Sequence, residues 1–258
     1  MTKQEAIKKV LDIAKSYIGY LEKASKDDLD DPKANIGSGN YTKFARDYFP
    51  ELQGMEWCCM FVYSCFAYAF NSIMAQNLLS GCKTAKCSIL QEAMKKANKI
   101  VSKPEQGDLI FFKNSSGNIT HIGIVSNVNG NKIETIEGNT SIGNNVVIAS
   151  GGGVYQKYYE INNPRIHSFG RPLWGLVAND TEQSQNEGEN LVKEALVIAT
   201  NVNIRKDAGT SNPVIGMVTL NENIEILGEK KDSSGFKWYK IKIPNEAGYI
   251  RSDFVKIK

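Results

Sequence analysis

Histidine is almost absent from this chain: His121 and His167 are the only two among 258 residues. Structural zinc sites bring thiolates and imidazoles together at close spacing, and neither C-x-x-C nor H-x-x-x-H occurs in the sequence. We therefore expect neither a bound metal nor a cofactor. The scarcity also narrows a choice, because any reaction that needs an imidazole base has only two candidates.

Cysteine is confined to one stretch of the chain. An odd number of cysteines within thirty residues, with none elsewhere, is not a typical disulfide framework. We expect reduced thiols, most of them packed in a core, where cysteine behaves as a small apolar residue. The five cysteines are Cys58, Cys59, Cys65, Cys82 and Cys87.

Long apolar runs and strong charge are missing as well. No stretch of 18 or more apolar residues occurs, so we expect no membrane insertion. The apolar positions of residues 1–20 are interrupted by charges, which predicts an amphipathic helix and no signal peptide. The net charge is only +3, and residues 191–258 carry it with 11 basic and 8 acidic side chains, leaving 20 of each elsewhere. This excess suits an anionic polymer such as a cell wall, and it is too small to predict nucleic-acid binding.

One polar segment divides the chain. Residues 179–190 contain no apolar side chain, which is typical of a linker. We therefore predict a first domain over residues 1–178 and a second over 191–258. The first begins with helical patterns and continues with short β-branched segments between turn residues, which predicts an α+β fold. The second shows only short strands, which predicts a small all-β barrel.

The elements expected from these patterns fall into two groups. Helices are predicted over residues 1–20, 41–48, 57–70 and 89–98. Strands are predicted over residues 108–112, 121–128, 132–136, 146–149 and 154–160, and in the second domain over 194–199, 214–218, 223–228, 238–243 and 246–250.

The segment Trp57-Cys58-Cys59-Met60-Phe61-Val62 carries the chemistry, because it places a cysteine in the first turn of a buried helix. Unpaired backbone N–H groups and the positive end of the helix dipole stabilise a thiolate there, and also an oxyanion beside it. Cys65 lies two turns deeper on nearly the same face, so we expect it to be inert. Only one of Cys58 and Cys59 can face a site. On the helix pattern alone, the alternative that all three are core cysteines stays open.

A thiolate nucleophile needs a base within hydrogen-bond reach, and His121, which opens a core-like strand, is the candidate. His167 is interpreted as structural. A two-residue loop at Asn129-Gly130 would turn Glu137 and Asn139 away from His121. A three-residue loop that adds Asn131, or one bulge, would place His121 opposite Asn139 and diagonal to Glu137. Because an imidazole base needs such a partner, the site requires the odd spacing.

At this point the sequence resembles the CHAP family (cysteine, histidine-dependent amidohydrolase/peptidase). The matching runs are residues 37–43, then E-W-C-x-x-F-V, G-D-L-I-F-F, H-I-G-I-V, I-E-G-N-T and F-G-R-P, in family order over most of residues 1–178. The resemblance implies a papain-like, NlpC-type fold in which N-terminal helices pack on an antiparallel sheet. It implies cleavage of peptidoglycan amide bonds, with Cys58 as nucleophile, His121 as base, and Glu137 and Asn139 as the third and fourth polar positions.

Two features depart from the family pattern. A small residue, often alanine, is usual where this chain has Cys59. Some relatives bind calcium through an acidic loop before the cysteine. The acidic run here lies early and lacks the expected spacing, so we interpret it as a solvated loop. It consists of Asp27, Asp28, Asp30 and Asp31.

Residues 191–258 resemble the bacterial SH3-like domain common in wall hydrolases. The resemblance is carried by residues 202–211, 214–216, 237–241 and 248–250. It implies a cell-wall-binding module. The alternative is a generic small barrel in which Trp238 and Tyr249 belong to the core.

Together the two resemblances predict a phage endolysin-like peptidoglycan hydrolase, monomeric, held in the host cytoplasm before lysis and acting on the wall once the membrane opens. We expect a thioester intermediate and cleavage between N-acetylmuramic acid and L-alanine. A peptide or cross-bridge bond is the alternative. The rival functions are a cysteine protease or acyltransferase with the same thiolate, and a wall-adhesion protein whose site is inactive.

Overall fold

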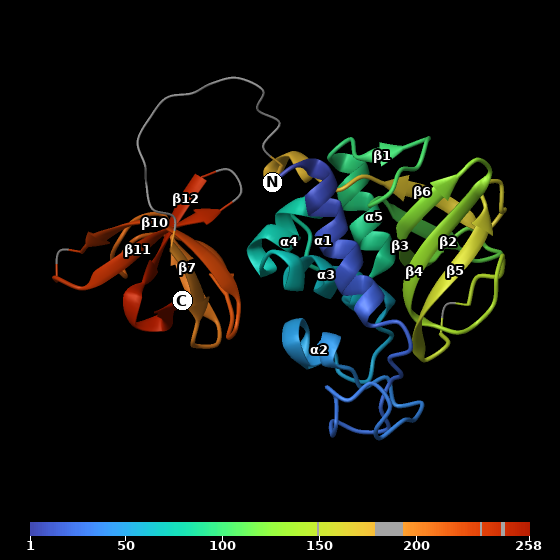
Figure 1. Ribbon diagram of the computed structural model, residues 1–258, viewed down its shortest axis with the longest axis horizontal. Coiled ribbons are helices and arrows are strands. Elements are labelled where there is room, and N and C mark those ends of the chain that lie inside the picture. Colours follow the sequence, from blue (N-terminus) through green and yellow to red (C-terminus); the bar gives the residue numbers. More distant parts are fainter. Residues whose placement is uncertain (149, 179–192, 233, 244–245) are drawn as a thin grey trace.

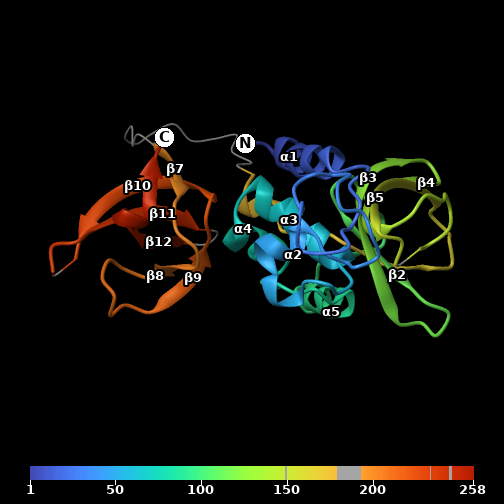
Figure 2. The same ribbon diagram turned by 90° about the horizontal axis from the view of Figure 1, so that it is seen from below.

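The computed structural model describes residues 1–148, 150–178, 193–232, 234–243 and 246–258. These residues form two lobes, each built around its own sheet and its own hydrophobic core (Figures 1 and 2). The predicted linker, residues 179–190, lies outside the described residues.

The helices of the first lobe come before its sheet. In α1, Thr2 and Glu5 form a capping box, and the buried side chains repeat at helical spacing. In α3, eleven of the twelve residues are buried, because the helix lies between other helices and the sheet. The helices are α1 (Lys3–Ser16), α2 (Lys43–Tyr48), α3 (Cys58–Ala69), α4 (Ser72–Leu78) and α5 (Cys87–Lys96), with short 3₁₀ turns η1 (Pro50–Leu52) and η2 (Trp174–Leu176).

The sheet of the first lobe is antiparallel, and its strands run in the order β1-β6-β2-β3-β4-β5. Helix α3 packs against the central strands β3 and β4 (Figure 1). The predicted α+β fold is therefore confirmed. The strands are β1 (Ile100–Val101), β2 (Leu109–Lys113), β3 (Ile119–Asn129), β4 (Lys132–Thr140), β5 (Gly153–Glu160) and β6 (Ile166–Gly170).

The second lobe is all-β, as predicted. Its strands follow the order β13-β7-β10-β11-β12-β8-β9, and alternate residues point into an aliphatic core. The strands are β7 (Lys193–Val197), β8 (Val202–Arg205), β9 (Val214–Val218), β10 (Asn223–Lys231), β11 (Lys237–Ile243), β12 (Glu246–Arg251) and β13 (Val255–Ile257), with a 3₁₀ turn η3 (Ser252–Phe254).

Several elements differ from the predictions. The strand predicted over residues 146–149 is wrong for residues 146–148, which form a loop whose carbonyls are bound by side chains rather than by another strand. Helix α5 begins at Cys87, two residues earlier than predicted. The patterns also missed the short elements α4, β1, β6, β8 and β13, because tertiary contacts rather than local periodicity define segments of this length.

Among the described residues, no single helix is both long and apolar enough to cross a membrane. Helices α3 and α4 reach that length and hydropathy only when taken together, and a bend of 119° separates them.

Helix α4 lies closest to the second lobe in both views and joins the two lobes (Figures 1 and 2). Its Ile73 belongs to the aliphatic core of the second lobe. Gly216 on β9 makes room for it, because a Cβ there would lie 2.9 Å from Ile73 Cδ1. The backbone N–H of Ser72 donates to Glu222 Oε2 at 3.1 Å. The wall-binding module of the prediction is therefore packed against the first lobe.

Glu222 makes this junction sensitive to pH. Its carboxyl is 5% exposed, its Oε1 has no partner, and burial raises its pKa above the ordinary value. A carboxyl with a raised pKa costs stability once pH exceeds its unfolded pKa. Glu222→Gln should therefore raise the Tm at about pH 8 and lose that gain by about pH 4. The exposed Glu225→Gln is the matched control in calorimetry, and an equal gain at both pH values would contradict the prediction.

Candidate active site

The first turn of α3 holds the candidate nucleophile. Cys58 is the first residue of the helix and is 3% exposed. The preceding Trp57 is fully buried, stacks on Phe44 with ring centroids 5.6 Å apart, and donates its indole N–H to Glu22 Oε2 at 3.0 Å. Trp57 thus fixes where the helix begins, and with it the position of the Cys58 sulfur.

Strands β3 and β4 bring His121 and Glu137 to this helix end. His121 Nε2 and Glu137 Oε2 lie 2.9 Å apart, and both side chains are completely buried. The other ring nitrogen, Nδ1, has no hydrogen-bond partner. Cys58 lies close enough to interact with the imidazole and to raise its pKa. Cys58 therefore interacts with His121, and His121 in turn contacts Glu137.

The hairpin between β3 and β4 has the odd spacing that the site requires. Asn129 pairs with Lys132 across a two-residue turn, and a bulge between Val125 and Asn127 then shifts the register by one residue. Beyond it, Ile124 pairs with Ile136, and the hydrogen bond between His121 and Glu137 shows that these two side chains share one face of the hairpin. The odd spacing predicted for His121 and Glu137 is therefore present. Of the two predicted ways to produce it, the structure has the bulge and not the three-residue loop. The irregularity lies inside the strand, where the sequence carries no turn signal.

Two glycines allow the elements that carry the candidate site residues to approach one another. A Cβ on Gly123 would lie 2.6 Å from Glu137 Cγ, so the carboxylate crosses β3 where no side chain stands. A Cβ on Gly138 would lie 2.6 Å from Phe61 Cβ and 2.9 Å from Trp57 Cζ3. At both positions, only glycine allows the backbone to lie this close to the neighbouring side chains.

Asn139, the fourth predicted residue, forms no hydrogen bond with the His121 imidazole. It is fully buried at the end of β4 with a φ of 55°, and neither Nδ2 nor Oδ1 has a partner. Its backbone carbonyl accepts from the N–H of Gly151 at 3.0 Å. A buried amide without a hydrogen-bond partner lowers the stability of the fold.

The Glu137 carboxylate is held by partners that the sequence reasoning missed. Thr135 Oγ1 donates to Oε1 at 2.5 Å, and the Tyr159 hydroxyl donates to Oε2 at 3.2 Å. Lys157 is fully buried on β5 and donates to the Val146 carbonyl at 2.8 Å. The available signal was alternation, because Thr135 stands two residues before Glu137 on the same face of the strand.

The thiols near the site have different surroundings. The Cys59 thiol donates a hydrogen bond to the Thr84 carbonyl at 3.2 Å rather than to the His121 imidazole. Cys65 is completely buried, and burial raises the pKa of its thiol well above the ordinary value, as expected of an inert cysteine. Cys87, which the sequence reasoning left among the core cysteines, begins α5 and lies 3.5 Å from Cys58, sulfur to sulfur.

Cys58 and His121 compete for one proton. The neighbouring Cys87 thiol and then burial raise the pKa of Cys58, while His121 lowers it. Burial lowers the pKa of His121, but Cys58 and Glu137 outweigh it and raise this pKa to about 9. Cys87 thus favours the proton on sulfur, and Glu137 favours it on the imidazole.

The acidic run does not assemble a metal site. Among the described residues, no group of three or more His, Cys, Asp or Glu side chains is placed to hold a metal ion. Asp30 instead accepts hydrogen bonds from Arg46 at 2.6 and 2.9 Å, and Lys43 lies 3.3 Å from the same carboxylate.

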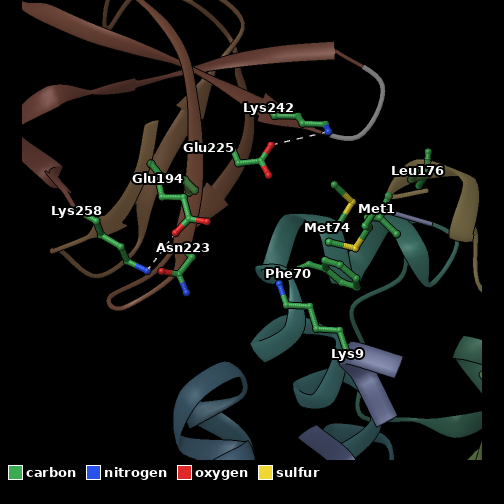
Figure 3. A pocket seen from close by; sticks show the side chains of 12 residues that line it. Met1, Lys9, Phe70, Met74, Leu176, Glu194, Asn223, Glu225, Lys242 and Lys258 are labelled. Carbon is green, nitrogen blue, oxygen red and sulfur yellow. Dashed lines mark ion pairs between the residues drawn. The ribbon is translucent and has the colours of Figure 1, made fainter. Parts of the chain in front are cut away.

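A pocket of about 310 Å³ lies between the two lobes rather than at Cys58 (Figure 3). Lys9, Phe70 and Met74 line one side, and Glu194 and Glu225 the other. None of the predicted site residues contributes to it. Its acidic side chains are paired with lysines of the second lobe, at 3.8 Å for Lys258 and Glu194. We assign the site to the Cys58 environment because the reactive groups meet there.

Family models match both lobes. The CHAP domain model matches residues 51–139, which include Cys58, His121, Glu137 and Asn139, and the bacterial SH3 domain model matches residues 200–256. The chain carries a CHAP domain followed by a bacterial SH3 domain. Both predicted resemblances are confirmed.

Solved structures similar to this CHAP–SH3 chain include Ly7917, with 11% identity over 97% of both chains and a TM-score of 0.36. Ly7917 with the hydrolyzing product of MDP has 13% identity over 97% of both chains and a TM-score of 0.34. NlpC2 from Trichomonas vaginalis has 10% identity over 62% of this chain and 47% of that chain, with a TM-score of 0.22. No curated protein sequence matches the chain. The domain assignment therefore rests on the two family matches.

The presence of only two histidines allows a direct test of the site. In a histidine-labelled sample, NMR titration should give His121 a pKa of about 9 and His167 a pKa below its ordinary value, because His167 is partly desolvated near Lys113 and Lys95. Glu137→Gln should lower the pKa of His121 because the neutral amide stabilises the imidazolium less. Glu134→Gln, on the other face of β4, is the control and should leave it unchanged. Titration of His121 below His167 would contradict this geometry.

Proposed function

We propose that the chain hydrolyses an amide bond of peptidoglycan, with Cys58 as nucleophile. The observation that carries the proposal is the buried His121–Glu137 pair beside a cysteine at a helix N-terminus, within the residues that match the CHAP domain. The CHAP match supports peptidoglycan as substrate, and the bacterial SH3 match supports the wall as binding partner.

In the proposed reaction, His121 takes the proton of Cys58, and the thiolate attacks the amide carbonyl carbon. The N–H groups of the first turn of α3, which have no partner within the helix, stabilise the oxyanion. Collapse of this intermediate forms a thioester, and the leaving amine takes the proton from His121. Water, deprotonated by His121, then releases the acid. Glu137 stabilises the imidazolium throughout, while Thr135 and Tyr159 hold its carboxylate in place.

We propose the bond between N-acetylmuramic acid and L-alanine as the target. Mass spectrometry of digested walls decides between this bond and a peptide bond. Amidase action releases stem peptides with a free L-alanine amino group and leaves unmodified glycan strands. Endopeptidase action instead leaves the stems on the glycan and exposes a new amino group within them. Fragments of the second kind alone would replace the amidase proposal by the endopeptidase one.

We further propose an endolysin role, with the protein held in the host cytoplasm until the membrane opens. Cells that produce it should remain intact until a membrane-permeabilising agent is added and should then lyse. Lysis without that agent would contradict the role in a phage lytic cycle and leave the enzymatic proposal standing.

The nucleophile assignment has a paired test. Cys58→Ser should reduce wall lysis by about 10³-fold or more, because the serine hydroxyl is a far weaker nucleophile with this base. Cys59→Ala should keep most of the activity, since the Cys59 thiol is hydrogen-bonded to Thr84 and not to His121. Turbidity of a wall suspension gives the rates, and circular dichroism checks folding. The reverse pattern in two folded variants would move the nucleophile to Cys59.

Wall binding is tested separately from catalysis. The full chain carrying Cys58→Ala should sediment with purified walls, whereas residues 1–178 carrying the same change should stay largely in the supernatant. Both proteins lack the nucleophile, so any difference reports binding by the second lobe. Equal sedimentation of the two would assign wall binding to the first lobe.

A further inference from the structure

Cys87 is a buried nucleophile for which the proposed reaction has no use. Its side chain is 6% exposed, and its sulfur lies 3.5 Å from that of Cys58. Cys58 and Cys87 are the first residues of α3 and α5, so two helix N-termini meet at this pair of sulfurs. A helix N-terminus favours the thiolate form of a cysteine. Here other groups outweigh that effect. The Cys87 thiol and burial raise the pKa of Cys58, and although Cys58 lowers the pKa of Cys87, Cys59 and burial raise it above the ordinary value.

We propose that Cys58 and Cys87 form a reversible disulfide when the protein meets a hydroperoxide, with Cys87 as the resolving thiol. The inference rests on the proposed function only for its consequence, which is that the disulfide blocks the nucleophile. The formation of the bond depends on the two sulfurs alone.

The chemistry balances in two steps. The Cys58 thiolate attacks one peroxide oxygen, the O–O bond breaks, and Cys58 becomes a sulfenic acid while water or an alcohol leaves. The Cys87 sulfur then attacks the Cys58 sulfur, gives up its proton, and releases water. The two cysteines together lose two electrons, which the peroxide gains. A dithiol such as dithiothreitol reverses the change by exchange.

The geometry requires only a short movement. The sulfurs are in van der Waals contact and must approach by about 1.5 Å to reach the length of a disulfide. Neither helix has a side-chain N-cap, but Trp57 before α3 is fully buried and hydrogen-bonded to Glu22, whereas Lys86 before α5 is exposed. We therefore expect the Cys87 end of α5 to move.

The other thiols are worse partners for Cys58. Cys65 lies two turns further along α3 than Cys58 and is fully buried in the core. Cys82 is half-buried and five residues before Cys87, outside the contact. Cys59 is the one competitor, because it also interacts with Cys87. A Cys59–Cys87 bond would leave Cys58 free, so the test must distinguish the two bonds.

The experiment treats the reduced full-length protein with hydrogen peroxide, removes the oxidant with catalase, and measures intact mass, alkylatable thiols and wall lysis before and after dithiothreitol. The wild type should lose about 2 Da and two of its five thiols, and should recover most of its lysis after reduction. Cys59→Ala should behave in the same way, which assigns the bond to Cys58. Cys82→Ala is the matched control from the neighbouring loop and should also match the wild type.

Cys87→Ala should not form the species that lacks 2 Da. Its Cys58 should instead gain about 32 Da as the irreversible sulfinic acid, so that dithiothreitol restores little of this variant's own starting activity. The proposal is overturned if the wild type forms no such disulfide, if the bond joins Cys59, or if Cys87→Ala recovers as fully as the wild type. A Cys58–Cys87 disulfide in a protein without lytic activity would instead overturn the proposed function and leave the thiol pairing intact.

Discussion

The close approach of β4 to the start of α3 is the constraint on which the site depends. Gly138 lies where any side chain would collide with Phe61 and Trp57, so the strand that carries Glu137 rests directly on the helix that carries Cys58. Gly123 on β3 likewise leaves space for the Glu137 side chain, which reaches across β3 to contact His121. The absence of side chains at these two points allows a buried acid, an imidazole and a thiol to come together in the core.

The buried groups of the site determine whether the Cys58 sulfur or the His121 imidazole holds a proton. On one side, Glu137 is fixed by Thr135 and Tyr159 and attracts the proton towards the imidazole. On the other side, Cys87 stabilises the protonated sulfur. Near neutral pH, the raised pKa of His121 favours the imidazolium, and the raised pKa of Cys58 favours the thiol. Proton transfer from Cys58 therefore requires the fraction of the protein in which His121 is neutral. Cys87, which raises the pKa of Cys58, is also the thiol best placed to form the proposed disulfide with it after oxidation.

Much of this arrangement is predictable from the sequence, and the exceptions have physical causes. The apolar run after Trp57 predicts the buried helix and the position of Cys58, because burial on every side leaves an unmistakable pattern. Parity alone predicts that His121 and Glu137 need an odd register. The location of the bulge near Ser126 is not predictable, because a bulge is set by packing on both faces and has no turn residue to mark it. Thr135, Tyr159 and Cys87 were missed because their roles arise from contacts across the sheet and between two helix ends, which lie far apart in the sequence.

The packing of Ile73 into the second lobe gives the molecule a mechanical property. Only Phe70 and Asn71 separate α3, which begins with Cys58, from α4, which is embedded in the second lobe. A force applied to the second lobe is therefore transmitted through α4 and two connecting residues to the helix that begins with Cys58. Because Ile73 packs in the core of the second lobe and Ser72 bonds to Glu222, reorientation of the first lobe requires these contacts to break. Under the proposed function, the orientation in which the second lobe binds the wall then sets which wall strands come within reach of Cys58.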